Sequence, residues 1–558
     1  MATHDLIPKV VGINRTQDAS ICLMHGSRIA CAIQKERLTR QKHHWGRTGD
    51  LRDVYGPRLA DLDRPIDALV ECYSSDAEID NLTAYEQELT DTLPLSPHCH
   101  RARISHHLAH LYSVFHPSPF DQAAVMIIDG QGSNVCDFTE EWRSGAPGHW
   151  REVSSFYQAD RSHIKCMDKQ LWNRDGKRLV GLGMFYFLLT QAIFPGEGNE
   201  GKVMGLAPHG DPHALALPPL EVDGPAVTIP DRWMEIVHAG QRFRYAADDS
   251  ARFSDIANLA AAGQRAFENA VLEVARWLHQ RTGADNLCFA GGTALNCSAN
   301  DRLLRETPFR HVFIPPAPGD AGTAIGCAMY GMTELLCAPS SYRWEHDFLG
   351  PEPRAAEMEA ALHNAEDLII EIPADLVARV ADLLCETRIV ALYNGRSEFG
   401  PRALGHRSIL GDPRRATVRD WINARVKQRE WFRPLAPIVL LEHADRYFDI
   451  RRPSPFMQFA APVRPDAAEL IPAVTHVDCT ARLQTVGVSD DPFLRAVLEA
   501  FDARTGIPVL LNTSFNRREE PIVESPAEAL DTFRHTPLHA LAMPPYLIRK
   551  RGEPEAVN

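Results

Sequence analysis

The segment AAVMIIDGQGS, residues 123–133, joins a run of six apolar residues to an acidic glycine turn. A short apolar run that ends at Asp-Gly predicts a buried strand, with Asp129 at its carboxyl end, where the sites of α/β proteins gather. Similar runs at residues 10–13 and 389–393 predict further buried strands, and residues 267–278 carry apolar side chains on one helical face. Strands that alternate with helices predict an α/β fold built in layers.

The composition is that of a globular protein, since 44% of the 558 residues are hydrophobic and 24% are charged. This length predicts roughly three or four domains. Lys and Arg number 59 and Asp and Glu 73, which gives a net charge of −14 without a long basic block. We therefore expect no nucleic acid and no anionic membrane among the partners.

The sequence also predicts the cellular compartment. The N-terminal residues MATHD lack the basic-then-apolar pattern of a signal peptide. The most apolar stretch, residues 179–194, is too short to cross a bilayer and predicts a buried helix. The 12 cysteines include no CxxC pair, which disfavours a zinc ribbon and a disulfide framework. These features predict a soluble cytoplasmic protein.

Two proline-rich segments divide the chain. Residues 208–230 hold six prolines, too many for a regular element, and predict an inserted excursion or a cap. Residues 338–354, APSSYRWEHDFLGPEPR, have the composition of a domain linker. We therefore expect a larger domain at residues 1–340 and a smaller one at residues 355–558.

Histidines and glycine turns mark a candidate site in the N-terminal part. In SHHLAH, residues 105–110, His106 and His110 are four residues apart, so on a helix both imidazoles project from one face and can share a metal. Residues 318–323 (PGDAGT) form a second acidic glycine turn, and residues 291–296 (GGTALN) follow another apolar run. Such turns let backbone N–H groups approach a phosphate. Taken alone, the histidines also fit a pair on the surface or in the core, and the glycine segments also fit plain tight turns.

Basic residues interleaved with glycine and proline mark the C-terminal part. They occur in GRSEFGPRALGHRSIL, residues 395–410, and in NARVKQREWFRPLAP, residues 423–437. Cations in such rigid loops predict a pocket for a phosphorylated small molecule rather than a solvated helix face. Ser514 and Asn516 follow an apolar run at residues 509–511, where a hydroxyl and an amide suit contacts with phosphate or adenine.

The ordered segments HHLAH, DGQGS, GNEGKVMGLAPHG, GGTALNC and PGDAGTAIG resemble those of the carbamoyltransferase family that modifies antibiotics and nodulation factors. The N-terminal half of that family is similar to the tRNA threonylcarbamoyl-transferase fold, a two-lobed α/β fold of the sugar-kinase and actin-like ATPase (ASKHA) class. The resemblance implies a metal site formed by His106, His110, Asp129 and Asp320. Two imidazoles and two carboxylates suit iron(II), with manganese and zinc as rivals. The resemblance also implies nucleotide contacts at Lys202, Gly291, Gly292 and Asn296.

One position departs from the family pattern. The family has a His-Asp pair after its first strand, where this chain has Gln17 and Asp18. An amide cannot act as a general base, so we expect Gln17 to hydrogen-bond the acceptor or the carbamoyl group. The downstream residues 36–40 (ERLTR) and Lys42-His43 match the family pattern.

The C-terminal segments resemble the YrdC-like α/β domain of the same family, which joins carbamoyl phosphate and ATP into carbamoyladenylate. This resemblance implies a site lined by Arg402, Lys427, Arg433, Arg482, Ser514 and Asn516. It gives Lys427 and Arg433 catalytic roles and places Met457 near the nucleotide. We expect ATP to bind with Mg²⁺.

Together these features predict an ATP-dependent O-carbamoyltransferase that acts on a hydroxyl of a small natural product. The alternatives are a tRNA threonylcarbamoyl-type transferase, a hydrogenase-maturation carbamoyltransferase and a non-enzymatic ATP-sensing module of the sugar-kinase class. The net negative charge disfavours a transferase that acts on tRNA. The absence of CxxC pairs disfavours the maturation enzyme, and the basic C-terminal pocket disfavours a non-enzymatic sensor. The sequence leaves open whether the acceptor is an aminoglycoside, a macrolide or its sugar, an ansamycin or a β-lactam, and whether the chain forms a homo-oligomer.

Overall fold

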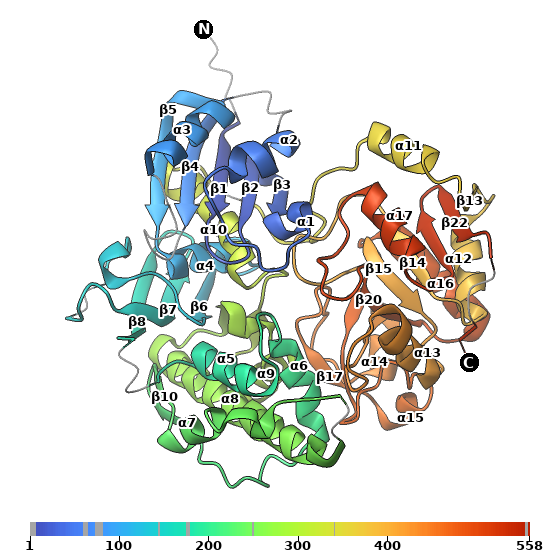
Figure 1. Ribbon diagram of the computed structural model, residues 1–558. Helices are drawn as coiled ribbons and strands as arrows, with labels where there is room; N and C mark the ends of the chain where they lie inside the picture. The colour runs from blue at the N-terminus through green and yellow to red at the C-terminus, as the bar shows by residue number, and fades with distance from the viewer. Residues whose placement is uncertain are drawn as a thin grey trace. The chain divides into compact units, whose positions relative to one another are not determined.

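The structure, a computed structural model, describes residues 7–59, 65–72, 82–142, 145–174, 179–247, 250–339, 341–552 and 556–557. The chain divides into two compact units, unit 1 (Met1–Glu345) and unit 2 (His346–Asn558), and the boundary falls in the proline-rich segment 338–354. Each unit consists of sheets and helices, which confirms the predicted α/β class (Figure 1).

Unit 1 begins with a five-stranded sheet of order β3-β2-β1-β4-β5. Its first three strands are antiparallel neighbours, and β4 and β5 run parallel to β1. The strands are β1 (Lys9–Asn14), β2 (Ser20–His25), β3 (Arg28–Gln34), β4 (Ile66–Cys72) and β5 (Leu95–Ile104). Strand β1 is buried along its whole length, in agreement with its apolar run.

A second sheet of unit 1 repeats this arrangement. Its order, β8-β7-β6-β11-β12, again places three antiparallel neighbours beside two strands parallel to the central one. The strands are β6 (Gln122–Ile128), β7 (Arg151–Asp160), β8 (Ile164–Trp172), β11 (Asn286–Ala290) and β12 (His311–Phe313). Asp129 directly follows β6, as predicted. Two sheets of the same topology therefore make two equivalent lobes within this unit.

The helices of unit 1 include both predicted ones. Residues 179–194 contain the expected helix, α5, but only one face of it is buried and Phe187 is exposed. The amphipathic helix expected at residues 267–278 is part of the much longer α8. The described helices are α1 (Lys35–Thr39), α2 (Gly56–Leu59), α3 (Leu82–Thr92), α4 (His106–Phe115), α5 (Leu182–Ile193), α6 (Glu200–Leu206), α7 (Asp231–Val237), α8 (Phe253–Thr282), α9 (Cys297–Glu306) and α10 (Thr323–Tyr330). Among the helices of the described residues in either unit, none combines the length and the apolar composition needed to cross a bilayer.

Helices α4 and α10 pack against each other between the two sheets of unit 1 (Figure 1). Glycines permit this contact, because a Cβ at Gly326 would lie 1.8 Å from the carbonyl oxygen of Ala109. A Cβ at Gly12 would likewise lie 2.1 Å from the carbonyl oxygen of Ala324. Strand β1 and helices α10 and α4 therefore meet backbone to backbone, which brings distant parts of the sequence to one place.

The proline-rich segment 208–230 is not wholly irregular, so the prediction for it was wrong in part. It contains an antiparallel hairpin of β9 (Glu221–Asp223) and β10 (Ala226–Thr228). The prolines lie before, between and after these two strands rather than within them, so they remove no hydrogen bond from the ladder.

Unit 2 is built on one eight-stranded sheet of order β13-β22-β21-β14-β15-β20-β16-β19, beside a small antiparallel pair of β17 and β18. The strands are β13 (Leu368–Glu371), β14 (Val390–Tyr393), β15 (Arg407–Gly411), β16 (Ala436–Leu440), β17 (Ala460–Pro462), β18 (Thr480–Arg482), β19 (Gln484–Val486), β20 (Val509–Ser514), β21 (Ala540–Met543) and β22 (Tyr546–Lys550). Strand β14 confirms the run predicted at residues 389–393.

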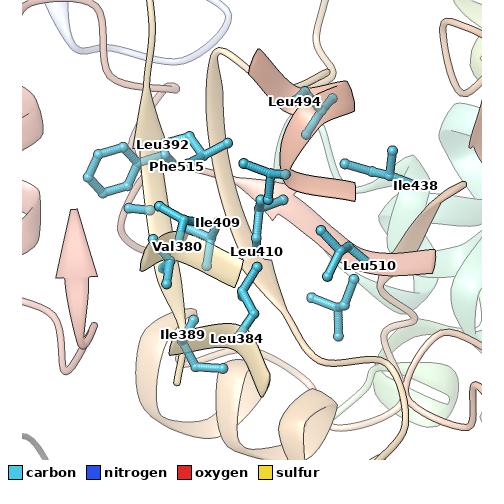
Figure 2. Close-up of a cluster of buried hydrophobic side chains, with 14 of the residues drawn as sticks. Val380, Leu384, Ile389, Leu392, Ile409, Leu410, Ile438, Leu494, Leu510 and Phe515 are labelled. Carbon is cyan, nitrogen blue, oxygen red and sulfur yellow. The ribbon is translucent and has the colours of Figure 1, made fainter. Parts of the chain in front are cut away.

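Apolar side chains of the unit 2 sheet and its helices form one core. Figure 2 shows Leu392, Ile409 and Leu510 of the sheet packed with Val380 and Leu384 of helix α12 (Leu376–Cys385). The described helices are α11 (Ala355–His363), α12 (Leu376–Cys385), α13 (Ala416–Trp421), α14 (Ala444–Tyr447), α15 (Pro465–Ala468), α16 (Pro492–Thr505) and α17 (Pro526–Arg534). This core fixes the sheet from which the basic loops of unit 2 extend.

Strand β20 is longer than predicted. The prediction placed Ser514 after a strand at residues 509–511, but Ser514 is the last residue of the strand. It pairs with Ser408 of β15, and this ladder keeps three polar residues extended where their composition suggested a turn.

Candidate functional site

Four side chains in unit 1 converge on one point. His106 and His110 on α4 bring their Nε2 atoms to 3.2 Å, so the spacing of four residues places both rings on one face. Asp129 Oδ2 lies 3.1 Å from His106 Nε2 and 3.4 Å from His110 Nε2. Asp320 Oδ1 lies 3.5 Å and 3.8 Å from the same nitrogens. The structure thus brings together all four predicted ligands, with one ligand atom of each within 4.8 Å of the others.

The four residues of this quartet (His106, His110, Asp129 and Asp320) stabilise one another's charges. Burial alone would lower the pKa of His106, but the charge of Asp320 and hydrogen bonds with Asp129 and Asp320 raise it well above its usual value. Burial would raise the pKa of Asp129, but hydrogen bonds with His106 and His110 hold it well below its usual value. The same four groups attract either protons or a cation, so the two compete for these donors.

The donor set fits a divalent transition metal. Two imidazole nitrogens and two carboxylate oxygens are a common coordination set for such an ion. The histidines are 1% and 0% exposed, so no water shell competes with the ion for them. His106, His110, Asp129 and Asp320 would therefore hold it.

A buried charge network lies behind the N-terminus of α4. Glu152 Oε1 accepts hydrogen bonds from the backbone N–H groups of His107 (3.0 Å) and Ser133 (3.1 Å), while Glu152 Oε2 contacts Lys169 Nζ at 2.5 Å. Lys169 also contacts Glu140 Oε1 at 2.6 Å. His107 turns toward this network and not toward the quartet, since its Nδ1 lies 2.7 Å from the hydroxyl of Ser155. Fixed charges thus hold the helix that presents the two histidines.

Substituting Lys169 tests this network. In Lys169→Met two carboxylates lose their buried cation, so we expect the free energy of unfolding to fall by about 3–5 kcal/mol. Urea denaturation measures the change, with Lys165→Met as the control because Lys165 is exposed on the same strand. Equal stability of the two variants would contradict the supporting role of Lys169.

Of the four predicted nucleotide contacts of unit 1, Gly291 and Gly292 lie in the turn next to Asp129. Gly292 donates its backbone N–H to Asp129 Oδ1 at 3.0 Å, and Gly291 makes the turn after β11 with a φ of 95°. Asn296 accepts a hydrogen bond from the backbone N–H of Ala299 and so caps α9. Lys202 lies on α6. The structure therefore places the glycines next to the quartet, and it gives Asn296 a role as a helix cap. Binding of a nucleotide by these four residues stays a prediction.

The turn after β1 also reaches the quartet. Asn14 Nδ2 donates to the backbone oxygen of Asp320 at 3.0 Å, and the Thr16 hydroxyl donates to Asp320 Oδ2 at 3.2 Å. The side chain of Gln17 makes no hydrogen bond within the described part of the chain. Sequence reasoning missed Asn14 and Thr16. The available signal was a polar residue at the end of an apolar strand, the same signal that identified Asp129.

Lys427 is the centre of the candidate site in unit 2. It is only 5% exposed and donates to the Asn516 side-chain oxygen at 2.8 Å, to the Asn516 backbone oxygen at 3.1 Å and to the backbone oxygen of Ser514. Ser514 Oγ in turn donates to Asn516 Oδ1 at 2.6 Å. The structure thus brings together three of the predicted residues, at the end of β20.

A group of arginines accompanies them. Burial lowers the pKa of Arg433, and the charge of Arg482 lowers it further against the opposing effect of Glu430. Burial and the charges of Arg433 and Arg482 hold the pKa of Arg429 well below its usual value. Mutual repulsion of this kind favours the binding of an anion, which would relieve it. Arg429 was not among the predicted site residues, although the density of basic residues in its segment was the signal.

Two further residues of unit 2, Arg402 and Met457, were predicted to lie at the site. Arg402 is half-buried on the loop between β14 and β15. Met457 is buried and has a φ of 57°, a left-handed conformation unusual for its side chain. The roles assigned to both stay predictions.

Comparison with known proteins gave the following matches. Residues 100–329 match the family model "Carbamoyltransferase N-terminus" and residues 381–550 match "Carbamoyltransferase C-terminus". Nodulation protein NolNO of Sinorhizobium fredii is 38% identical over 80% of the chain, which spans 64% of that relative's length. Nodulation protein NolO of Bradyrhizobium diazoefficiens is 36% identical, with 80% of this chain and 79% of the relative covered.

A protein of Synechocystis, sll1178, described as uncharacterized, is 32% identical over 96% of both chains. Among solved structures, full-length HypF in the phosphate- and nucleotide-bound form is 12% identical, with a TM-score of 0.38 over 61% of this chain and 57% of that one.

Proposed function

The chain belongs to the carbamoyltransferase family, and from that premise we propose that it is an ATP-dependent O-carbamoyltransferase. Carbamoyl phosphate and ATP would be joined into carbamoyladenylate, and the carbamoyl group would pass to a hydroxyl of a small natural product. The observation that carries the proposal is the presence of two chemically different sites in one chain. One is a pocket of cations in unit 2, and the other is a quartet of imidazoles and carboxylates in unit 1.

The adenylation step is proposed for unit 2, as a YrdC-like domain. Arg433, Arg482 and Arg402 neutralise the phosphate groups of carbamoyl phosphate and ATP. Water hydrolyses carbamoyl phosphate to carbamate and inorganic phosphate. A carbamate oxygen then attacks the α-phosphorus of ATP, and pyrophosphate leaves. Lys427 stabilises the charge that develops on the phosphate oxygens, and Ser514 and Asn516 keep its ammonium group in place. Bound Mg²⁺ is expected with ATP.

The transfer step is proposed for unit 1, as a fold of the sugar-kinase and actin-like ATPase class. The repeated sheet order of the two lobes supports this assignment. A divalent cation at the quartet, iron(II) in our proposal, would supply a Lewis acid that polarises the carbamoyl carbonyl. The turns at Gly291 and Gly292 offer backbone N–H groups to the nucleotide phosphate, and Lys202 adds a charge. The products are the carbamate ester and AMP.

One assay separates this enzyme from an ATP-sensing module. Purified protein is incubated with ATP and Mg²⁺, with and without carbamoyl phosphate, and pyrophosphate and AMP are measured. The proposal expects pyrophosphate release that depends on carbamoyl phosphate. ATP turnover that does not depend on carbamoyl phosphate, or no ATP turnover at all, would contradict the proposal. Aminoglycosides, macrolides, ansamycins and β-lactams are then screened by mass spectrometry for a carbamoyl gain.

Gln17→His is expected to retain transfer activity. The side chain of Gln17 makes no hydrogen bond within the described residues, and an imidazole of similar size can also donate and accept hydrogen bonds. Product formation in the assay above measures the effect, with Gln17→Ala alongside. A complete loss in Gln17→His would show that the amide makes a contact that an imidazole cannot replace.

A further inference from the structure

Asp18 and His43 form an ion pair beside the quartet. His43 Nδ1 lies 2.9 Å from Asp18 Oδ1, although one residue follows β1 and the other follows α1. Each has a φ of 53°, a left-handed conformation that is uncommon for residues with side chains. Such conformations persist where surrounding contacts enforce them, and they concentrate at functional sites.

Neighbouring side chains hold this pair in place. Asn14 Nδ2 donates to the backbone oxygen of Asp18 at 3.1 Å, and Glu36 Oε2 accepts the backbone N–H of His43 at 3.1 Å. The same Asn14 amide also donates to the backbone oxygen of Asp320. One buried amide therefore links the pair to a residue of the quartet.

The pair leaves one imidazole nitrogen available. Asp18 is acceptor-only when ionised, so it fixes the tautomer with the proton on Nδ1, and Nε2 keeps its lone pair when the ring is neutral. His43 Nε2 has no hydrogen-bond partner within the described part of the chain, and the side chain is 31% exposed. A Cβ at Gly198 would lie 2.1 Å from Nε2, so the nitrogen faces the loop that precedes α6 and Lys202.

We propose that His43, oriented by Asp18, is the general base that takes the proton from the acceptor hydroxyl. The assignment rests on the proposed function and adds a residue to it. In the step, the hydroxyl proton passes to Nε2 while its oxygen bonds to the carbamoyl carbon. The bond between that carbon and the phosphate oxygen then breaks, and AMP leaves with the electron pair. The imidazolium returns its proton to solvent.

The charges around His43 give this step a definite pH dependence. The hydrogen bond with Asp18 raises the pKa of His43 to about 9 against the effect of burial; the charges of Asp18 and Glu36 also raise it, and Lys42 opposes them. Glu200 of α6 also interacts with this ring. The ring is therefore mostly protonated at neutral pH, and its basic form increases about tenfold per pH unit until pH 9. Transfer should rise in the same way.

Two substitutions test the assignment with methyl glucoside as the hydroxyl probe. His43→Gln is expected to lower transfer about 10²-fold and to remove the rise with pH, while pyrophosphate release and metal content stay unchanged. Asp18→Asn is expected to move the rise to lower pH, because the carboxylate that raises the pKa is gone. His44→Gln, one residue along and outside the pair, is the control. Transfer in His43→Gln equal to that of the control, with the pH rise retained, would overturn the assignment.

An NMR titration of ¹³C-labelled histidine, with His43→Gln to assign the signal, tests the pair without turnover. A midpoint that lies above the usual value and falls in Asp18→Asn supports the pair, and a midpoint that Asp18→Asn leaves unchanged overturns it. Absence of carbamoyl-phosphate-dependent pyrophosphate release from the native chain would instead overturn the proposed function, and the base with it. Loss of a second bound metal in His43→Gln would make Asp18, Glu36 and His43 a cation site and overturn the base.

Discussion

His110→Ala is expected to abolish carbamoyl transfer and to leave carbamoyl-phosphate-dependent pyrophosphate release intact. His110 is completely buried, and its Nε2 lies within 3.4 Å of both His106 Nε2 and Asp129 Oδ2. Its removal leaves three donors, so metal occupancy should fall. Transfer should fall by about 10³-fold, since a Lewis acid contributes several kcal/mol to such a step. Carbamoyladenylate would still form, leave the protein and hydrolyse to AMP.

Pyrophosphate, carbamoylated product and bound metal are measured in parallel on the folded variant. His107→Gln is the matched control, because His107 lies on the same helix but turns toward Ser155. It should keep its metal. Equal metal loss in both variants would contradict the quartet geometry. A loss of pyrophosphate release in His110→Ala as complete as that in Lys427→Ala would contradict the division into two sites.

Lys427→Ala is expected to suppress both pyrophosphate release and product formation. The ammonium group is buried against the oxygens of Ser514 and Asn516, so alanine removes the charge and the hydrogen bonds that these oxygens accept from it. A contribution of roughly 3 kcal/mol to the developing phosphate charge corresponds to somewhat more than 10²-fold in rate. The bound metal of unit 1 should be unaffected.

Arg425→Ala is the control for Lys427→Ala, since Arg425 is an exposed cation two residues earlier in the same segment. It should retain pyrophosphate release. Lys427→Met keeps most of the side-chain volume and shows whether the charge, rather than packing, carries the effect. Normal pyrophosphate release in both Lys427 variants would remove this residue from the adenylation step.

The sequence predicted what local patterns determine. An apolar run placed Asp129 at the end of β6, and a spacing of four residues placed His106 and His110 on one face of α4. The two quartet residues from other segments, Asp129 and Asp320, were assigned through a family resemblance, because their approach to α4 depends on long-range packing.

Contacts between segments explain what the sequence did not predict. The extended conformation of Ser514 depends on its partner Ser408 in the neighbouring strand. The pairing of Asp18 with His43 depends on the turn that Asn14 organises, and no period or spacing in the chain reports it. The hairpin of β9 and β10 was missed because proline content was judged over a whole segment and not position by position.

The repeated sheets of unit 1 have a mechanical consequence. Helix α4, with His106 and His110, follows the last strand of the first sheet, while Asp129 and Asp320 follow β6 and β12 of the second. An ion held by these four residues would therefore connect the two lobes directly. Both imidazoles are buried, so separation of the lobes would expose them to solvent and weaken their hold on the ion. The rate at which a chelator removes the ion would then report on how fast the two lobes open.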